Sequence, residues 1–278
     1  MSERILLAGC GDLGRRVAQR LLARGDEVYA LRRRPGAGTG DGIRWLRGDL
    51  ADPASLRGLP RGVARLVYLP APAERGEAAY RALFVDGARH LLDALDGAAL
   101  RRVLFVSSSA VYGEHAGAWV DETTPADPPG FNGRVLLEAE HRLAQHAPMV
   151  ALRLAGLYGP GRLQLVERLR AGQARAPRAV PHWANRIHVD DAAAAVVHLL
   201  DLPEAQPLYL GVDDTPLPLD ALYDHLATLL GVPLPPAGPP PAGVGSKRLS
   251  NARLRASGFV PRWPETRAGY AAWLGAAP

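Results

Sequence analysis

The chain has 278 residues, of which 47% are hydrophobic and 22% are charged, a composition typical of a globular protein with a sizeable core. The formal charge of +5 is spread among acidic residues instead of a basic arm, so we expect no nucleic-acid partner. No apolar run could span a bilayer and the amino terminus has no signal-peptide core, so we expect a cytoplasmic protein without a membrane partner. Cys10 is the only cysteine and the histidines lack ligand spacing, which argues against disulfides and metal sites.

Short β-type apolar runs alternate with helical patterns from the start of the chain. The expected strands are Arg4–Ala8, Glu27–Leu31, Ile43–Leu46, Leu66–Leu69, Val103–Val106 and Met149–Leu154. Helical spacing is seen at about 13–22, 74–95 and 134–146. This alternation predicts an α/β fold with a doubly wound parallel sheet, covered by helices on both faces.

The pattern becomes less regular after about residue 160, where proline-rich segments appear at 203–218 and 233–241. We therefore predict a nucleotide-binding domain at 1–160 and a smaller substrate-binding region at 161–278. The stretch 186–211 has a strand-and-helix pattern of the kind that can return to the main sheet. The boundary therefore need not be a single cut.

Three closely spaced glycines, Gly9, Gly11 and Gly14, follow the first predicted strand and open the first predicted helix, with Asp12 and Leu13 between them. Glycine at these positions permits a tight turn, close approach of backbone to a pyrophosphate, and close packing of helix on strand. The helix N-terminus adds free N–H groups and a partial positive charge. Because the motif lies in a βαβ unit, it predicts a Rossmann-type dinucleotide site.

Arginines stand at the end of the second predicted strand. In NAD-binding sites this position usually holds an acidic residue that hydrogen-bonds the ribose hydroxyls. Guanidinium groups suit a phosphate monoester, so Arg32 and Arg33 predict NADP(H) as the cofactor, with NAD the less favoured choice. The alternative interpretation is a solvated basic turn.

Two further segments end strands at the same predicted sheet edge. Asp49 and Leu50 follow the third strand, where the carboxylate could accept a hydrogen bond from the adenine amino group; the alternative is a turn or capping aspartate. Leu69, Pro70 and Ala71 end the fourth strand, and their backbone would line the cofactor.

The fifth strand ends in Ser-Ser-Ser-Ala-Val-Tyr-Gly at residues 107–113, which places hydroxyls at the carboxyl edge of the sheet. With this segment the chain resembles the short-chain dehydrogenase/reductase superfamily, in its extended NAD-dependent epimerase/dehydratase form. Segments 133–138, 153–162 and 186–191 are similar to an atypical bacterial branch, the YeeZ-like proteins. The resemblance covers residues 9–254.

The resemblance implies a catalytic set in which Ser108 polarises the substrate and a Tyr-x-x-x-Lys pair follows. Here Gly130 stands where the tyrosine belongs and Arg134 where the lysine belongs. Lys247, the only lysine, is far away in the chain, so the usual pair cannot form locally. Arg134 could still supply charge, whereas the phenol would have to be Tyr112 or Tyr158, and either can equally be a packed aromatic.

By the same resemblance, other residues should face the cofactor or the substrate. Leu154 and Ala155 should pass near the nicotinamide, and the substrate side should include Ser109, Tyr158, Arg186 and His188. Further proton-transfer candidates are His188, Asp190, His182, Asp121 and Glu122. For Asp190 and Asp191 the preferred interpretation is capping of the helix that follows them.

Two hypotheses follow. The first is an NADP(H)-dependent oxidoreductase or epimerase-like protein that acts on a carbonyl or sugar-type small molecule with a degenerate Tyr-Lys site. The second is a non-catalytic NADP(H)-binding protein with a redox-responsive or regulatory role. Extended relatives pair through the helices equivalent to 74–95 and 134–146, so a homodimer is expected by resemblance.

Overall fold

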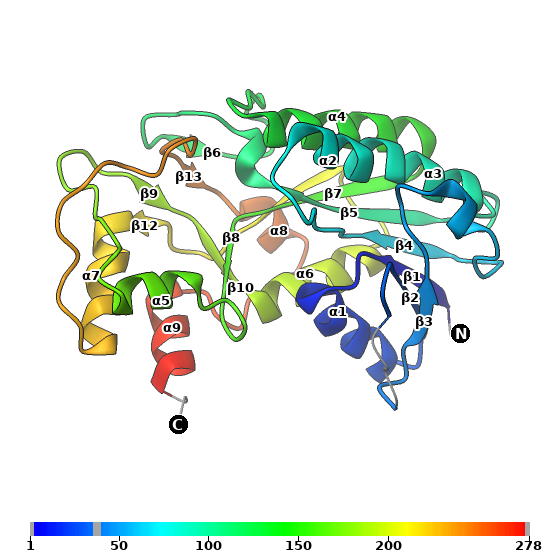
Figure 1. Cartoon of the computed structure of the whole chain (residues 1–278), viewed down its shortest axis with the longest axis horizontal. Helices are drawn as coiled ribbons and strands as arrows, with labels where there is room; N and C mark the ends of the chain where they lie inside the picture. The colour runs from blue at the N-terminus through cyan, green and yellow to red at the C-terminus, as the bar shows by residue number, and fades with distance from the viewer. Residues whose placement is uncertain (1–2, 36–39, 276–278) are drawn as a thin grey trace. The chain divides into compact units, whose positions relative to one another are not determined.

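A computed structural model describes residues 3–35 and 40–275 of the chain (Figure 1). Its main feature is a seven-stranded parallel sheet with strand order β11-β7-β5-β4-β1-β2-β3. The strands are β1 (Arg4–Ala8), β2 (Glu27–Arg32), β3 (Arg44–Arg47), β4 (Arg65–Tyr68), β5 (Arg102–Ser108), β7 (Met149–Leu154) and β11 (Leu208–Gly211). The predicted fold class is confirmed, and each of the six expected strands is present within two residues of its predicted bounds.

β1 is an interior strand of the sheet, which pairs with β2 on one side and with β4 on the other. Residues 5–8 of β1 are buried and apolar, as expected of a strand that is covered on both faces. The chain runs outward from β1 to β2 and β3, then returns to β4 on the opposite side. Strand order therefore reverses beside β1, and open α/β sheets bind ligands at the carboxyl edge of such a reversal.

Helices cover both faces of the sheet (Figure 1). They are α1 (Asp12–Ala23), α2 (Glu77–Arg81), α3 (Gly87–Ala94), α4 (Phe131–His146) and α6 (Val189–Asp201). α2, α3 and α4 lie together on one face, and α1 lies on the other. Among the helices of the described residues, none is both long and apolar enough to cross a membrane.

The helix predicted over 74–95 begins later and is not uniform. Between α2 and α3 the backbone forms a π-helical turn, η2 (Ala82–Asp86). The Tyr68 hydroxyl donates a hydrogen bond of 2.5 Å to the Leu83 carbonyl, so an outside partner competes for a carbonyl of this turn. Insertion of a side chain into the helical ladder is a known cause of such local irregularities.

The chain divides into two compact units. Unit 1 comprises 1–111, 130–153 and 193–209, and unit 2 comprises 112–129, 154–192 and 210–278. The chain passes between the units several times, whereas the sequence pattern suggested a boundary near residue 160. A functional division at residue 160 stays a prediction.

Unit 2 contains the smaller elements around an apolar cluster. They are β6 (Trp119–Val120), β8 (Gly156–Tyr158), α5 (Gln164–Arg170), β9 (Trp183–Ala184), β10 (Arg186–His188), β12 (Leu217–Pro218), α7 (Leu219–Leu230), β13 (Arg248–Leu249), α8 (Ala252–Ala256) and α9 (Thr266–Gly275). Three two-stranded pairs form, β10 with β8, β12 with β9 and β13 with β6. Tyr158, Leu222, Leu226 and Tyr270 are among the buried residues of the cluster.

Candidate functional site

Each of the three glycines in the turn between β1 and α1 has different surroundings, which explain why a side chain is absent at that position. Gly9 has φ +91°, and a Cβ there would lie 2.3 Å from the Pro70 Cα, so only glycine fits between this turn and the end of β4. A Cβ at Gly14 would lie 3.1 Å from the Cys10 Sγ, where the helix packs closely on the strand. A Cβ at Gly11 would meet no heavy atom within 4 Å. The backbone at Gly11 is therefore open to a ligand, as a pyrophosphate would need.

α1 begins at Asp12, and its N-cap residue, Gly11, provides no side-chain hydrogen bond to cap the helix. The first N–H groups of this helix consequently keep their capacity to bind an anion, and the helix dipole favours negative charge there. Asp12, in the first turn, is exposed and forms a 3.2 Å ion pair with Arg16. Leu13 is buried. The turn thus has the features that a dinucleotide diphosphate requires.

Two guanidinium groups share one aromatic ring at the end of β2. The Arg32 Cζ lies 5.6 Å from the centroid of the Trp45 ring, and the Arg15 Cζ lies 5.1 Å from it. Arg15 stands in the first turn of α1, so the pair is next to the glycine turn. Stacking restricts these side chains and leaves their N–H donors available to a phosphate. Arg33 is exposed, and sequence reasoning missed both Arg15 and Trp45.

The predicted cofactor-lining residues after β3 (Asp49 and Leu50) and after β4 (69–71) differ in burial and in hydrogen bonding. Asp49 accepts a 3.0 Å hydrogen bond from the Ala51 N–H, which favours the turn interpretation of this aspartate. Leu50 is buried, and its carbonyl lies 2.9 Å from the His90 Nδ1. After β4, Leu69 is buried, Pro70 adjoins Gly9, and Ala71 is exposed.

The single cysteine lies inside the glycine turn and is fully buried. Burial raises the pKa of the Cys10 thiol to about 11, against the weaker lowering influence of Arg32 and Arg15. The thiolate is the reactive form of cysteine, so this thiol is unreactive near neutral pH. A redox response through Cys10 is accordingly disfavoured.

The three consecutive serines after β5 have different surroundings. Ser107 is buried and its hydroxyl donates a 2.6 Å hydrogen bond to the Glu140 Oε1. Ser108 is half-buried, and its Oγ accepts a 3.2 Å hydrogen bond from the Ala110 N–H, so its own proton can still be donated to a ligand. Ser109 begins a short 3₁₀ turn. Of the three, Ser108 is the hydroxyl best suited to polarise a substrate.

Glu140 and Arg153 form a buried ion pair behind Ser107. The Arg153 Nη2 lies 2.6 Å from the Glu140 Oε2, and both side chains are 6% exposed. Arg153 also donates through its Nε to the Glu140 Oε1 at 3.0 Å. This ion pair connects α4 to the end of β7, and the hydrogen bond from Ser107 joins the end of β5 to the same carboxylate.

Gly130, where the resemblance predicts a tyrosine, is the N-cap residue of α4. Gly130 has φ −108° and ψ 158°, an extended conformation open to any residue. A Cβ there would meet only the Asn132 Oδ1, at 2.7 Å, which belongs to a movable side chain. Arg134 is exposed in the first turns of α4. The backbone at Gly130 could therefore accept a tyrosine, and the replacement of a tyrosine and a lysine at these two positions stays a prediction from the resemblance.

Tyr112 is 1% exposed, and its hydroxyl donates a 3.1 Å hydrogen bond to the Asp121 carbonyl. Burial and this bond favour the packed-aromatic interpretation over acid–base catalysis. Asp121 itself receives hydrogen bonds from Thr123 and Thr124 in a tight turn. Glu122 accepts from the Leu210 N–H at 2.9 Å, again a structural role.

Three predicted substrate-side residues come together in unit 2. β8 and β10 pair in parallel, which places Arg186 beside Gly156 and His188 beside Tyr158. The His188 ring contacts the Tyr158 ring edge-on at 5.1 Å, and both are buried. Among the described residues the Tyr158 hydroxyl has no hydrogen-bond partner. Leu154 and Ala155, which were predicted to pass near the nicotinamide, are buried.

The Asp190–Asp191 pair stands in the first turn of α6, where negative charge is favourable. Asp191, however, does not use its carboxylate to cap that helix. Its two oxygens accept hydrogen bonds from the Arg262 and Trp263 N–H groups, at 2.9 and 2.8 Å. The predicted capping role is therefore wrong for Asp191, because a distant loop supplies better placed donors.

Asp213 is a buried carboxyl group that sequence reasoning did not single out. It is 1% exposed and accepts hydrogen bonds from the Thr266 hydroxyl and the Thr215 N–H. Burial raises its pKa to about 7, against the lowering effect of the Thr266 hydrogen bond. The pKa of Asp213 is higher in the folded than in the unfolded chain, so the protonated carboxyl group favours the folded state. The contribution of Asp213 to the free energy of unfolding is therefore complete below about pH 4 and is lost as the pH rises to about 7.

We expect Asp213→Asn to remove this loss of stability. Asparagine can still accept the Thr266 hydrogen bond and carries no charge, so the variant should gain stability at pH 8, by about 4 kcal/mol at most. Denaturant unfolding at pH 5 and pH 8 measures the difference. The exposed Asp127→Asn variant is the control, and equal pH dependence of Asp213→Asn and the unchanged chain would contradict the expectation.

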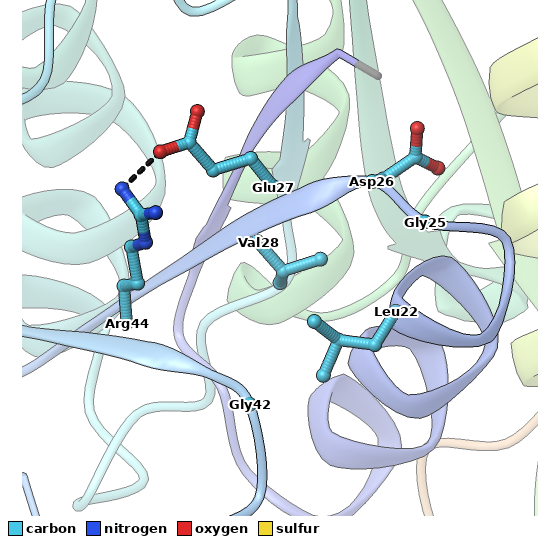
Figure 2. Close-up of a pocket in the computed structure, with 7 residues that line it drawn as sticks. All are labelled: Leu22, Gly25, Asp26, Glu27, Val28, Gly42 and Arg44. Atoms are coloured by element: carbon cyan, nitrogen blue, oxygen red, sulfur yellow. Dashed lines mark hydrogen bonds and ion pairs between the residues drawn. The ribbon is translucent and has the colours of Figure 1, made fainter. Parts of the chain in front are cut away.

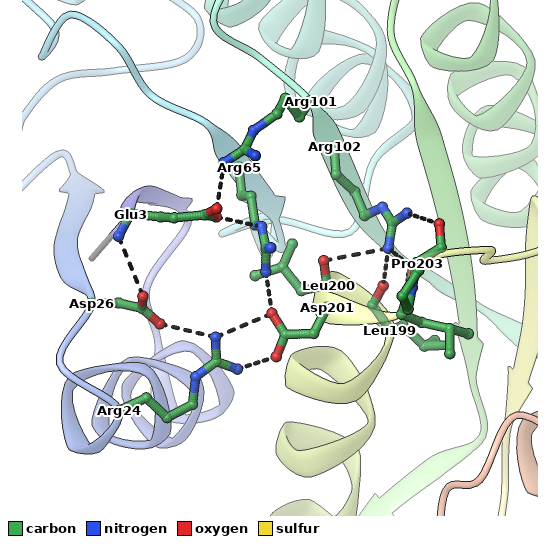
Figure 3. Close-up of polar contacts among 11 residues, drawn as sticks. Glu3, Arg24, Asp26, Arg65, Arg101, Arg102, Leu199, Leu200, Asp201 and Pro203 are labelled. Carbon is green, nitrogen blue, oxygen red and sulfur yellow. Dashed lines mark hydrogen bonds and ion pairs between the residues drawn. The ribbon is translucent and has the colours of Figure 1, made fainter. Parts of the chain in front are cut away.

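The opposite edge of the sheet holds a pocket of about 410 Å³ and a network of ion pairs. The pocket is lined by Leu22 of α1 and by residues such as Glu27 and Arg44 at the amino ends of β2 and β3 (Figure 2). In the network, Asp201 at the end of α6 binds both Arg24 and Arg65 (Figure 3). Both features lie at the amino ends of the strands, whereas the glycine turn follows the carboxyl end of β1.

Comparisons with known proteins identify the family of the chain. A family model described as "NAD dependent epimerase/dehydratase family" matches residues 5–209. The chain is 30% identical over 250 residues to protein YeeZ of Escherichia coli K12, covering 84% of this chain and 86% of that protein. The chain belongs to the NAD-dependent epimerase/dehydratase family of the short-chain dehydrogenase/reductase superfamily. The resemblance inferred from the motifs is thus confirmed.

Solved structures support the same assignment. One, from Methylobacillus flagellatus and assigned to the NAD-dependent epimerases/dehydratases, is 39% identical, covers 99% of both chains and has a TM-score of 0.85. Another, a short-chain dehydrogenase/reductase superfamily protein from Agrobacterium tumefaciens with bound NAD, is 26% identical, covers 98% of this chain and 97% of that one, and has a TM-score of 0.82.

Proposed function

We propose that the chain is an NADP(H)-dependent oxidoreductase or epimerase-like enzyme that acts on a carbonyl or sugar-type small molecule. The observation that carries the proposal is the open glycine turn beside the paired guanidiniums of Arg15 and Arg32. The bound nicotinamide would supply or accept hydride. The N-terminus of α1 would hold the diphosphate, and the residues after β4 would line the cofactor.

The preference for NADP(H) rests on charge at the end of β2. Arg32 and Arg15 offer donors to a ribose 2′-phosphate, and Trp45 holds both side chains in place. Arg33 is an additional exposed cation at the same strand end. Residues 31–35 at this strand end include no aspartate or glutamate that could bind the free hydroxyls of NAD or repel the phosphate.

Arg32→Gln should weaken NADPH binding roughly tenfold to a hundredfold, because a charge-assisted hydrogen bond is lost, and should leave NADH binding almost unchanged. Fluorescence titration with both cofactors measures the two dissociation constants. Arg47→Gln is the matched control, since Arg47 is the exposed neighbour of Arg32 on β3. Tighter binding of NADH than of NADPH by the unchanged chain would contradict the preference.

In the proposed reaction Ser108 donates its hydroxyl proton to the substrate oxygen and thereby polarises the carbonyl. Arg134 supplies positive charge on α4 in place of the lysine. Ser109, Tyr158, Arg186 and His188 are proposed to line the substrate side, where the edge-on pair of Tyr158 and His188 gives a rigid wall. Tyr112 is proposed only as a packed support for this region, given its bonded hydroxyl.

The test is turnover by the unchanged chain and by Ser108→Ala across aldehydes, ketones and sugar nucleotides with NADPH. We expect slow hydride transfer that falls roughly a hundredfold in Ser108→Ala, with NADPH affinity retained. Gly130 in place of tyrosine favours the alternative of a non-catalytic NADP(H) binder. Tight NADPH binding without turnover on any of these substrates would select that alternative.

A homodimer is proposed through the outer face of α3 and α4. A groove there is lined by Phe84, Val85, Leu92, Leu143 and neighbouring residues, and these are mostly apolar. Apolar grooves between helices are suited to helix–helix contacts between copies. Sedimentation velocity of the full chain measures the mass, and a monomer at all concentrations would contradict the dimer.

A further inference from the structure

An arginine and two tryptophans of unit 2 form a partly exposed cation–aromatic cluster. The Arg248 Cζ lies 5.1 Å from the centroid of the Trp119 ring and 4.8 Å from the centroid of the Trp183 ring. These residues belong to β13, β6 and β9, three strands that are far apart in the chain but part of the same compact unit. We refer to the three residues as the Arg248 cluster.

The pairing of β13 with β6 turns the Arg248 cluster outward. The two strands run parallel, and Arg248 is the register partner of Trp119. The next pair along the strands, Leu249 and Val120, is buried. Because successive side chains of a strand point to opposite faces, Arg248 and Trp119 lie on the other face of the strand pair. Trp119 is 56% exposed and Arg248 is half-buried, so this face is open to a ligand.

A strained turn before β6 holds the arginine in place. The Arg248 Nε donates a 2.7 Å hydrogen bond to the Gly117 carbonyl. Ala116 has φ +49°, and elsewhere in the described part of the chain positive φ values are found only at glycines. A Cβ at Gly117 would lie 2.8 Å from the Trp183 Nε1, so glycine lets this ring lie against the turn. Strained residues of this kind persist where the surrounding structure fixes them, and they gather at functional sites.

The two terminal nitrogens of the Arg248 guanidinium are available to a ligand. Within residues 3–35 and 40–275 this side chain makes one hydrogen bond, through its Nε, and no ion pair. By contrast, Arg178 of the same unit pairs with Asp224 at 2.7 Å. The terminal nitrogens of a guanidinium form a planar fork of N–H donors that matches two oxygens of a phosphate or a carboxylate. A purely structural brace between strands would not need this fork to stay unpaired beside an exposed ring.

We propose that the Arg248 cluster binds an oxyanion, a phosphate or carboxylate group, carried by a small molecule with a flat ring. The terminal nitrogens of Arg248 bind two oxygens of the anion, and the exposed part of the Trp119 indole packs on the ring. Contact with the two tryptophans restricts the guanidinium before the ligand arrives, which lowers the entropic cost of binding. Every residue of the site belongs to unit 2, so the inference does not depend on the proposed cofactor.

The chain has five tryptophans, and each gives one indole N–H signal in a proton–nitrogen NMR spectrum. Trp119→Phe, Trp183→Phe and Trp45→Phe assign the three signals that matter. The full chain is titrated with phenyl phosphate, with benzoate and with the uncharged control benzyl alcohol. We expect at least one anion to shift the Trp119 and Trp183 signals saturably, and the anion that binds more tightly identifies the group. No saturable shift of these two signals, or a shift of the Trp45 signal alone, would overturn the proposal.

Variants then separate the guanidinium fork from the general positive charge of the chain. Arg248→Gln should weaken binding of the preferred anion about tenfold or more, because charge-assisted hydrogen bonds are lost. Arg168→Gln, at an exposed arginine of the same unit, is the control and should leave the affinity unchanged. Trp119→Ala removes an exposed ring and serves as a second variant if Arg248→Gln disturbs folding. It should weaken binding about threefold or more, measured at the Trp183 signal. Unchanged affinity in either folded variant of the cluster would overturn the proposal.

Discussion

Glu140→Gln should destabilise unit 1 by about 3–5 kcal/mol, the cost of leaving one partner of a buried ion pair uncompensated. The Glu140 and Arg153 side chains are each only 6% exposed, so water cannot replace the lost charge. Glutamine keeps the size of the side chain, and the loss is therefore one of charge and hydrogen bonding. Ser107 is affected as well, since its hydroxyl donates to the same carboxylate. Guanidinium denaturation followed by circular dichroism measures the free energy of unfolding.

The same helix offers the control for this expectation. Glu138, two residues earlier on α4, pairs with Arg81 at 2.7 Å, but the two side chains are 30% and 42% exposed. Glu138→Gln should therefore cost at most about 1 kcal/mol. The double variant Glu140→Met with Arg153→Leu should lose less free energy of unfolding than Glu140→Gln, because no unpaired charge remains buried. Equal losses in Glu140→Gln and Glu138→Gln would show that burial does not set the cost.

Gly130→Tyr combined with Arg134→Lys should raise turnover roughly a hundredfold or more, since a positioned general acid contributes about 10²–10⁴-fold. The pair would restore Tyr-x-x-x-Lys at the start of α4. Gly130 is already extended, and the only close neighbour of a new Cβ is the movable Asn132 side chain. The change in kcat with NADPH and a carbonyl substrate measures the gain.

Each single variant serves as a control, because neither tyrosine nor lysine alone completes the pair. If the double variant folds and binds NADPH but is no faster, the serine segment is not arranged for catalysis. That result would favour the non-catalytic alternative.

The sequence was sufficient to predict the strands of the sheet and the glycine turn at residues 9–14, because both depend on the local pattern of residues. Apolar runs such as 4–8 are strands since only a buried strand accommodates them, and Gly9 is required by the positive φ of its own turn. The arginines after β2 were likewise visible, and they motivate the NADP(H) proposal. Helix ends were less certain, as the start of α4 at Phe131 and the π-helical turn at 82–86 show.

Only the tertiary structure decided which side chains meet across long separations in the chain. Arg15 joins Arg32 through Trp45, Asp191 binds a loop 71 residues away, and Lys247 reaches the carbonyl of Gly113. Such contacts follow from how strands and loops pack, and no periodicity in the sequence encodes them. Local spacing therefore determined the family fold and the dinucleotide turn, whereas burial and long-range packing determined which titratable groups are perturbed and available for chemistry.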